Sequence, residues 1–142
     1  MNRIIIISLF VVIALLAACQ SATSGQPTDP AAVMDAYTEA INAHDVERAL
    51  SYVADDAVYE RPGGAFNGKA EVRTFVEGII ARDVHVELIG EREVNGEEVT
   101  WQSRVTIDDP ENPDGPQLEL VNNSASIVRD GKIVMHTASR GQ

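Results

Sequence analysis

The sequence has 142 residues and carries 22 acidic against 11 basic residues, which gives a formal net charge of −11. That length suits one ordinary domain with a single core and is too short for two. The acidic balance excludes nucleic acid as a partner, because phosphate backbones would repel the chain. The only cysteine is Cys19, so no internal disulfide can form and the domain must be stable through its core alone.

The first 18 residues have the features of an export signal. Arg3 is followed by an apolar run from Ile4 to Leu16 and then by small residues, as in a secretory signal peptide. The run is too short for a comfortable membrane span. An ordinary amino-terminal anchor, or a secreted protein with an incidental cysteine, is the alternative.

The junction Leu16-Ala17-Ala18-Cys19 resembles a bacterial lipobox. The resemblance implies that residues 1–18 are removed and that Cys19 carries diacylglycerol and a further acyl chain such as palmitate. Residues 19–29 are polar and rich in Ser, Thr, Gly and Pro, which predicts a flexible tether. We therefore expect a lipid-anchored, extracytoplasmic domain in a bacterial cell envelope, attached through lipid and not through surface charge.

Helical patterns come first in the mature chain. Asp29 and Pro30 predict an N-cap and a first helical position, followed by apolar residues at helical spacing through Asn42. A second, short helix is expected from Asp45 to the Asp55-Asp56 pair, followed by a strand at 57–60 and a turn at 61–64. A third amphipathic helix is expected after Asn67-Gly68.

The period changes to two from Asp83 onward. Asn95-Gly96 is a strong hairpin signal, and the segment from Asp108 to Pro116 has the composition of a loop. Asp130-Gly131 predicts another tight turn. Four consecutive antiparallel strands are therefore expected, one beginning near Val84 and the others at 99–107, 118–128 and 133–139.

This order of elements resembles the nuclear-transport-factor-2-like superfamily, in particular its SnoaL-like and steroid-isomerase-like branch. The segments that carry the resemblance are Tyr37–Asp45, Tyr52–Tyr59, Phe66–Val72 and Arg129–Ile133. It implies an α+β, cystatin-like cone over residues 30–142, with three N-terminal helices packed in a strongly curved, mainly antiparallel sheet. Such a fold leaves a conical pocket for a small molecule.

The alternation of the strands predicts which side chains enter the pocket. If Trp101 points inward, then Asn122, Ser124 and Ser126 on the next strand also point inward. Buried polar groups need partners, so this row suggests a wet or ligand-facing wall. The reverse parity, with Val121, Ala125 and Ile127 inside, is the alternative. On the last strand we expect one face to carry Val134, His136 and Ala138. The predicted ligand-binding residues are Tyr37, Tyr59, Trp101, Asn122, Ser124 and His136.

The resemblance also suggests catalytic positions, and the chain departs from two of them. Tyr37 matches the tyrosine that donates to an oxyanion in steroid isomerases, and an amphipathic core tyrosine is the alternative, which we favour. Arg61 stands before Pro62 where the general-base aspartate belongs. The partner acid is also missing, since the long strand reads Asn122-Asn123-Ser124. These departures argue against steroid isomerisation.

His136 is the remaining candidate for proton transfer, because histidine titrates near neutral pH. Its alternative role is that of a hydrogen-bonded wall residue. His44 and His85 are expected on the surface, and the three histidines share no metal-ligand spacing. The chain also lacks a phosphate loop and a dinucleotide fingerprint, so no metal and no cofactor are expected.

Two functions remain open. One is a lipid-anchored binding or accessory domain for a small apolar or amphipathic ligand. The other is a small-molecule isomerase, cyclase or hydratase that uses Tyr37 and His136. A homodimer could form through the outer sheet face at Thr100, Gln102, Arg104 and Thr106, because these residues are polar without being uniformly acidic.

Overall fold

The computed structural model describes residues 25–108, 115 and 117–141. The predicted signal peptide, Cys19 and most of the loop expected at 108–116 therefore lie outside the described residues. Within the described part, no helix is both long enough and apolar enough to cross a membrane.

The first two helices form as the sequence predicts, although the second is shorter. Helix α1 spans Pro30–Asn42, and the Asp29 carboxylate accepts a hydrogen bond of 2.9 Å from the Ala32 amide. Helix α2 spans Val46–Ser51 and is capped by Asp45. Both caps satisfy amide groups that have no partner within the helix. The buried face of α1 consists of Val33, Met34, Tyr37, Ala40 and Ile41.

The strand that follows is longer than predicted, and a second strand was missed. Strand β1 covers Val53–Arg61 and β2 covers Gly64–Asn67. They form a hairpin in which Pro62 and Gly63 make the turn, with Gly63 at a φ of 101°, as the proline–glycine order of a type II turn requires. The prediction that Asp55-Asp56 ends α2 was wrong, because both acids lie on β1, where the pairing with β6 is interrupted.

Helix α3 and the antiparallel meander confirm the predicted order. Helix α3 spans Lys69–Ile80. Two pairs of the strands after it are connected by tight turns, at Gly96-Glu97 and at Asp130-Gly131. Asp130 and Gly131 both have positive φ, as expected for a primed hairpin turn. The strands are β3 (His85–Asn95), β4 (Glu98–Ile107), β5 (Leu118–Arg129) and β6 (Lys132–Arg140).

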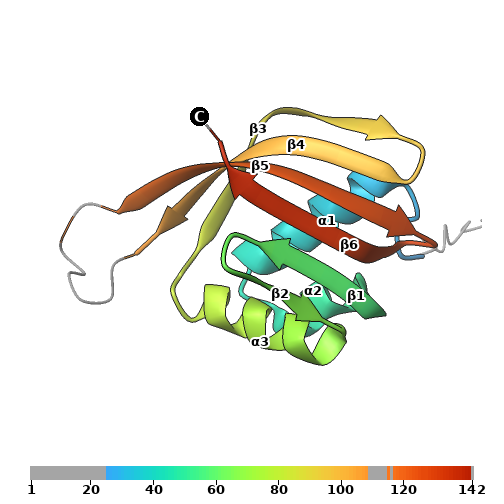
Figure 1. The fold of residues 1–142 in the computed structure, drawn as a ribbon, viewed down its shortest axis with the longest axis horizontal. Coiled ribbons are helices and arrows are strands. Elements are labelled where there is room, and N and C mark those ends of the chain that lie inside the picture. Colours follow the sequence, from blue (N-terminus) through green and yellow to red (C-terminus); the bar gives the residue numbers. More distant parts are fainter. Residues whose placement is uncertain (1–24, 109–114, 116, 142) are drawn as a thin grey trace, which may run out of the picture.

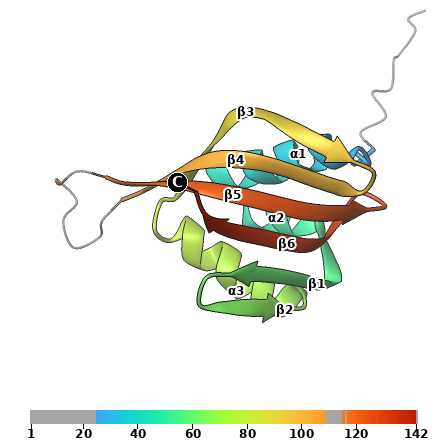
Figure 2. The ribbon, with the colours of Figure 1, turned by 45° about the horizontal axis from the view of Figure 1, so that its top comes forward.

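All six strands belong to one sheet in the order β2-β1-β6-β5-β4-β3. Only the β1–β6 pair is parallel; the other pairs are antiparallel. The helices cover one face of this curved sheet, with α1 behind β3, β4 and β5, and α3 against β1 and β2 (Figures 1 and 2). The predicted α+β cone with three helices in the hollow of a mainly antiparallel sheet is confirmed.

The predicted parity of the long strands is also confirmed, with one local exception. Trp101, Ser124 and Ser126 are buried inside the hollow, whereas Gln102 and Asn123 are exposed on the outer face. The exception is on β6. The pairing with β5 shifts between Ile127 and Val128, so Ile133 is fully buried and Val134 only half-buried, while His136 and Ala138 are buried as expected.

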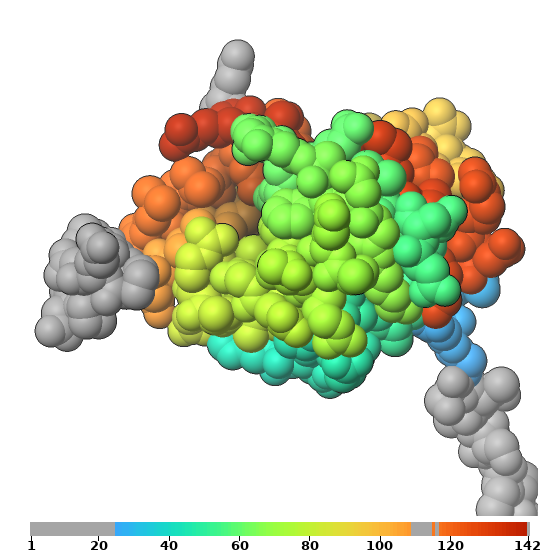
Figure 3. Space-filling view, turned by 60° about the horizontal axis from the view of Figure 1, so that its bottom comes forward, coloured from blue at the N-terminus to red at the C-terminus, as the bar shows by residue number. Residues whose placement is uncertain are grey.

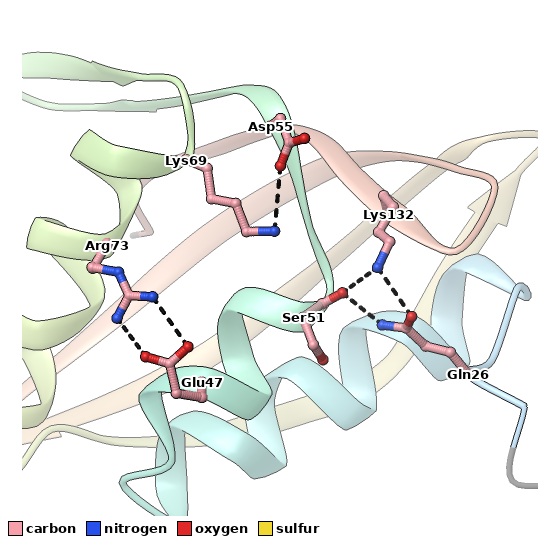
Figure 4. Close-up of polar contacts among 7 residues, drawn as sticks. All are labelled: Gln26, Glu47, Ser51, Asp55, Lys69, Arg73 and Lys132. Carbon is pink, nitrogen blue, oxygen red and sulfur yellow. Dashed lines mark hydrogen bonds and ion pairs between the residues drawn. The ribbon is translucent and has the colours of Figure 1, made fainter.

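The described end of the predicted tether contacts the domain (Figure 4). The Gln26 side-chain amide donates to the Ser51 carbonyl at 2.7 Å, and the Lys132 ammonium donates to the Gln26 side-chain oxygen at 3.0 Å and to the same Ser51 carbonyl. These contacts join the chain ahead of α1 to the end of α2 and the start of β6. The division into signal, tether and domain otherwise stays a prediction.

Candidate functional site

A cluster of aromatic side chains fills the inner part of the hollow. His136 lies between two of them, with its ring centroid 5.0 Å from Tyr59 and 5.8 Å from Trp101, on which it stacks. Tyr37 meets Tyr59 edge-on at 6.3 Å. All four side chains are buried. The sequence therefore brings four of its six predicted ligand-binding residues together, from α1, β1, β4 and β6, and they are packed directly against one another.

The environment of His136 keeps its imidazole neutral. Nδ1 lies 2.9 Å from the Ser126 hydroxyl in a buried hydrogen bond. Burial, with a smaller contribution from the positive charges of Arg61 and Arg92, lowers the pKa of His136 to about 3. An imidazole with such a pKa is a weak base at neutral pH. The geometry thus favours the role of a hydrogen-bonded wall residue over proton transfer.

The two buried phenols remain protonated. Burial raises the pKa of Tyr37 to about 12, an effect that Tyr59 and Arg61 partly oppose. Burial, followed by the neighbouring Tyr37, raises the pKa of Tyr59 well above its usual value. Within the described residues, the Tyr59 hydroxyl meets no partner in good hydrogen-bond geometry. An unpaired buried hydroxyl is costly, so this group could be satisfied by a water or a ligand atom.

A buried cation that was not predicted from the sequence lies beside this cluster. The Arg92 guanidinium lies 4.6 Å from the Trp101 ring centroid, and its side chain is only 4% exposed. Its Nε donates to Asp35 at 2.7 Å. The signal was available, because Arg92 has the same parity on its strand as the inward residues Val86 and Leu88, but a positively charged side chain was not expected inside.

An open cavity adjoins the aromatic cluster. Its volume is about 900 Å³. Figure 3 faces this side of the molecule, where the surface is hollowed between α3 and the ends of β4 and β5. Phe75 links the two regions, since it lines the cavity and its ring meets Tyr59 at 6.0 Å. The apolar walls consist of Phe66, Phe75, Ile79, Val84, Val86, Val105, Ile107, Leu118, Leu120 and Ala138.

Only one of the predicted ligand-binding residues lines this cavity. Asn122 lies on its wall, half-buried, next to Leu120 on the same strand. Trp101 and Ser124 contribute instead to a smaller, polar hollow of about 560 Å³ that lies mainly among outward-facing side chains of the sheet. Whether the six predicted residues bind a ligand stays a prediction. Of the six, Asn122 has the most direct support, because it lies on the cavity wall.

The charged residues that line the cavity are all arginines: Arg61, Arg82 and Arg140. The Arg61 guanidinium lies 4.7 Å from the Phe75 ring centroid, a cation–π contact that holds it at the wall. No Asp, Glu or His belongs to the described lining, so the cavity itself offers no carboxylate or imidazole for general acid–base catalysis. In the sequence, Arg61 was noted only as a departure from the steroid-isomerase pattern.

Metal ligands do not cluster in the part of the chain that the structure describes. No group of three or more His, Cys, Asp or Glu side chains there is arranged to hold an ion. His44 pairs with Asp83, with 2.9 Å between Nε2 and Oδ1, and His85 is exposed on β3. Both histidines therefore lie on the surface, as the sequence predicts.

Comparison with known proteins fits this architecture. The family model for the SnoaL-like domain matches residues 34–136. The chain belongs to the SnoaL-like family. The match covers most of the domain, including Tyr37 and His136, and confirms the resemblance proposed from the sequence motifs. No curated protein matches the chain.

Several solved structures share the fold at low sequence identity. An uncharacterized cystatin-fold protein from Novosphingobium aromaticivorans is 23% identical, with a TM-score of 0.63 over 76% of this chain and 95% of that one. The epoxide hydrolase/cyclase-like enzyme SalBIII is 17% identical, with a TM-score of 0.71 over 78% and 88%. An M. tuberculosis LEH-like epoxide hydrolase is 18% identical, with a TM-score of 0.68 over 82% and 86%. At these identities the likeness concerns the fold.

Proposed function

We propose that this SnoaL-like chain is a small-molecule-binding domain, held on the outer side of a bacterial membrane by lipid on Cys19. The observation that carries the proposal is the cavity of about 900 Å³ at the open end of the cone. A cavity of this size is within the range of small-molecule sites, which combine apolar walls with a few polar groups. Here the apolar walls come from α3 and the sheet, and Asn122 and Ser139 supply neutral polar groups.

Binding is better supported than catalysis by the residues at hand. Two of the structural neighbours are an epoxide hydrolase and an epoxide hydrolase/cyclase-like enzyme, and a related reaction is the second candidate. The described cavity lining, however, contains no acid and no histidine. The pKa of His136 is lowered to about 3, and His136 is packed between Tyr59 and Trp101. These features support a small-molecule-binding protein over an enzyme that uses acid–base catalysis.

The binding proposal can be tested by narrowing the cavity. Ala138 lies on its wall and is buried, so Ala138→Leu should weaken binding of any ligand found by thermal-shift screening. Ala125 lies on the neighbouring strand and belongs to the outer hollow, which makes Ala125→Leu a matched control that adds the same volume to the other face. Binding that is weakened only by Ala125→Leu would place the site elsewhere.

The anchor has its own test. The Cys19 thiol is the only cysteine sulfur in the chain, so Cys19→Ala should abolish fatty-acid labelling and release or mislocalise the domain. Several acyl chains hold a protein to a bilayer far more durably than one, which is why their loss should be visible in membrane fractionation. Labelling that persists in the Cys19→Ala protein would contradict the anchor.

The outer sheet face is our proposed site of self-association. Gln102 donates to Asn123 at 2.9 Å across this face, and Arg104 pairs with Glu87 at 2.8 Å, so the surface is polar and mixes neutral and charged groups. Such a surface suits a modest homodimer. Sedimentation velocity should show association that depends on concentration, whereas a monomer at every concentration tested would contradict it.

A further inference from the structure

Resting on the proposed function, we infer that the cavity selects amphipathic anions, molecules with an apolar body and a carboxylate or similar head group. The chain as a whole is strongly acidic, with a formal net charge of −11. Its cavity has the opposite character, because every charged residue in the described lining is an arginine. A positive site in an acidic protein is not explained by average composition.

The cavity also differs from the rest of the domain in how its charged side chains are paired. Among the described residues, the cationic side chains away from the cavity almost all have a carboxylate within 4.0 Å. These ion pairs are Arg48–Glu39, Lys69–Asp55, Arg73–Glu47, Arg92–Asp35, Arg104–Glu87 and Arg129–Glu97.

Arg61, Arg82 and Arg140 have no such partner in the part of the chain that the structure describes. Lys132, the remaining cation there, donates instead to Gln26 and to a backbone carbonyl. The chain therefore has acids for most of its other cations, yet none of the described carboxylates pairs with the three arginines that meet at the cavity.

Arg61 is the central member of this group. Its side chain is half-buried, and its guanidinium lies over Phe75 with a centroid distance of 4.7 Å, a contact that leaves the edge of the guanidinium able to donate. Burial, and to a smaller degree the like charge of Arg82, lower the pKa of Arg61. An anion placed beside Arg61 and Arg82 would compensate both effects, since a buried charge is costly unless it is paired.

Strands β5 and β6 supply a second polar position in the cavity. Asn122 and Arg140 are direct cross-strand partners on β5 and β6, and both line the cavity. An amide and a guanidinium at this position can donate to two oxygens of one carboxylate. Most of the remaining wall is apolar and includes Ile79, Leu118 and Leu120, which suits a hydrocarbon or aromatic body.

The test compares two probes of the same shape that differ in charge. The lipidated full chain in phosphatidylcholine nanodiscs is titrated calorimetrically with 4-phenylbutyrate and with the neutral 4-phenylbutanamide, and empty nanodiscs serve as the blank. The carboxylate should bind more tightly than the amide, and its affinity should fall as salt is raised. Removing all three arginines, with Arg61→Gln, Arg82→Gln and Arg140→Gln, should weaken carboxylate binding roughly tenfold or more and weaken amide binding much less, so that the preference for the carboxylate is lost.

Control variants separate charge in the cavity from charge in general. Arg129→Gln also removes one positive charge, but at the β5–β6 turn, and should leave both affinities unchanged. Arg82 and Arg140 are exposed, so their single variants keep the test valid if the triple variant unfolds. Equal affinities for the two probes would overturn the anion preference while leaving a binding cavity. Binding of neither probe would overturn the proposed function as well.

Discussion

The Ser126 hydroxyl lies 2.9 Å from Nδ1 of His136, so a buried hydrogen bond joins β5 to β6 inside the hollow of the sheet. The two residues are also direct cross-strand partners. This bond fixes the imidazole between Tyr59 and Trp101 and makes His136 a structural member of the aromatic cluster.

Ser126→Ala should destabilise the protein because it leaves a buried ring nitrogen without a partner. The expected loss is about 1–3 kcal/mol in the free energy of unfolding, measured by chemical denaturation. Ser124→Ala is the matched control on the same face of the same strand. Ser124 is also buried, but it makes no side-chain hydrogen bond to a described residue in good geometry, so its loss should be smaller. Equal effects of the two variants would contradict the assigned role of the bond.

Stability should fall as the pH is lowered from about 6.5. The pKa of His136 is about 3 in the folded protein and 6.5 in its unperturbed form. Between these values the unfolded state binds a proton that the native state does not, so unfolding becomes easier at lower pH. The slope should approach about 1.4 kcal/mol per pH unit.

The window between pH 5 and 6.5 isolates this effect, because the pKa values of Glu47 and Glu97 are lowered from 4.5 by Arg73 and Arg129. In that window His136→Gln should flatten the dependence of the unfolding free energy on pH, because it removes the buried imidazole. A slope that survives in His136→Gln would show that another group titrates.

Asn42 at the end of α1 protects the edge strand β3, and its removal should be costly. Its side-chain amide donates to the Val86 carbonyl at 2.8 Å, and its oxygen accepts from the Val86 amide at 2.9 Å. Both bonds satisfy backbone groups on the open edge of the sheet. Asn42→Ala should cost about 1–3 kcal/mol and accelerate amide exchange at Val86. Asn42→Asp keeps the oxygen that accepts from the Val86 amide. Amide exchange at Val86 that stays slow in Asn42→Asp and becomes fast in Asn42→Ala would support the assignment.

The contact ahead of α1 should depend on Lys132. Lys132→Met removes the donor that reaches Gln26 and Ser51, so proteolysis near Gln26 should become faster while the melting temperature changes little, because the contact is exposed. Lys69→Met is the matched control, since Lys69 makes a single 3.5 Å contact with Asp55 elsewhere on the surface (Figure 4). Identical proteolysis rates in the two variants would contradict this role.

The helices and the meander could be predicted because each has one apolar face with a clear period. Helix α3 and β4 illustrate this, since their buried residues recur at helical and alternating spacing. The start of β1 could not be predicted, because Asp55 and Asp56 lie in an exposed irregular part of a strand whose parallel partner is β6, far along the chain. Strand β2 was missed because four residues beginning with glycine carry too little pattern.

The candidate site, too, could be predicted only where it depends on local sequence pattern and not where it depends on tertiary contacts. The alternation around Trp101 predicted which strand faces are buried, and it placed Asn122 on the cavity side. It could not show that His136, Tyr59 and Trp101 pack on one another, since that depends on contacts between distant strands. Nor could it show that Arg61 lacks a carboxylate neighbour among the described residues, because charge pairing is settled only when the chain has folded.

The claim that the cavity binds small molecules is tested most directly by determining where a bound probe lies. Nuclear Overhauser contacts between the aromatic protons of 4-phenylbutyrate and methyl groups of the labelled protein would locate it. The account predicts contacts to Ile79, Val105, Leu118 and Leu120, which line the cavity, and none to Ala125 and Thr137, which line the outer hollow. Contacts to the outer methyl groups alone, or to no methyl group at saturating probe, would contradict a binding function for the cavity.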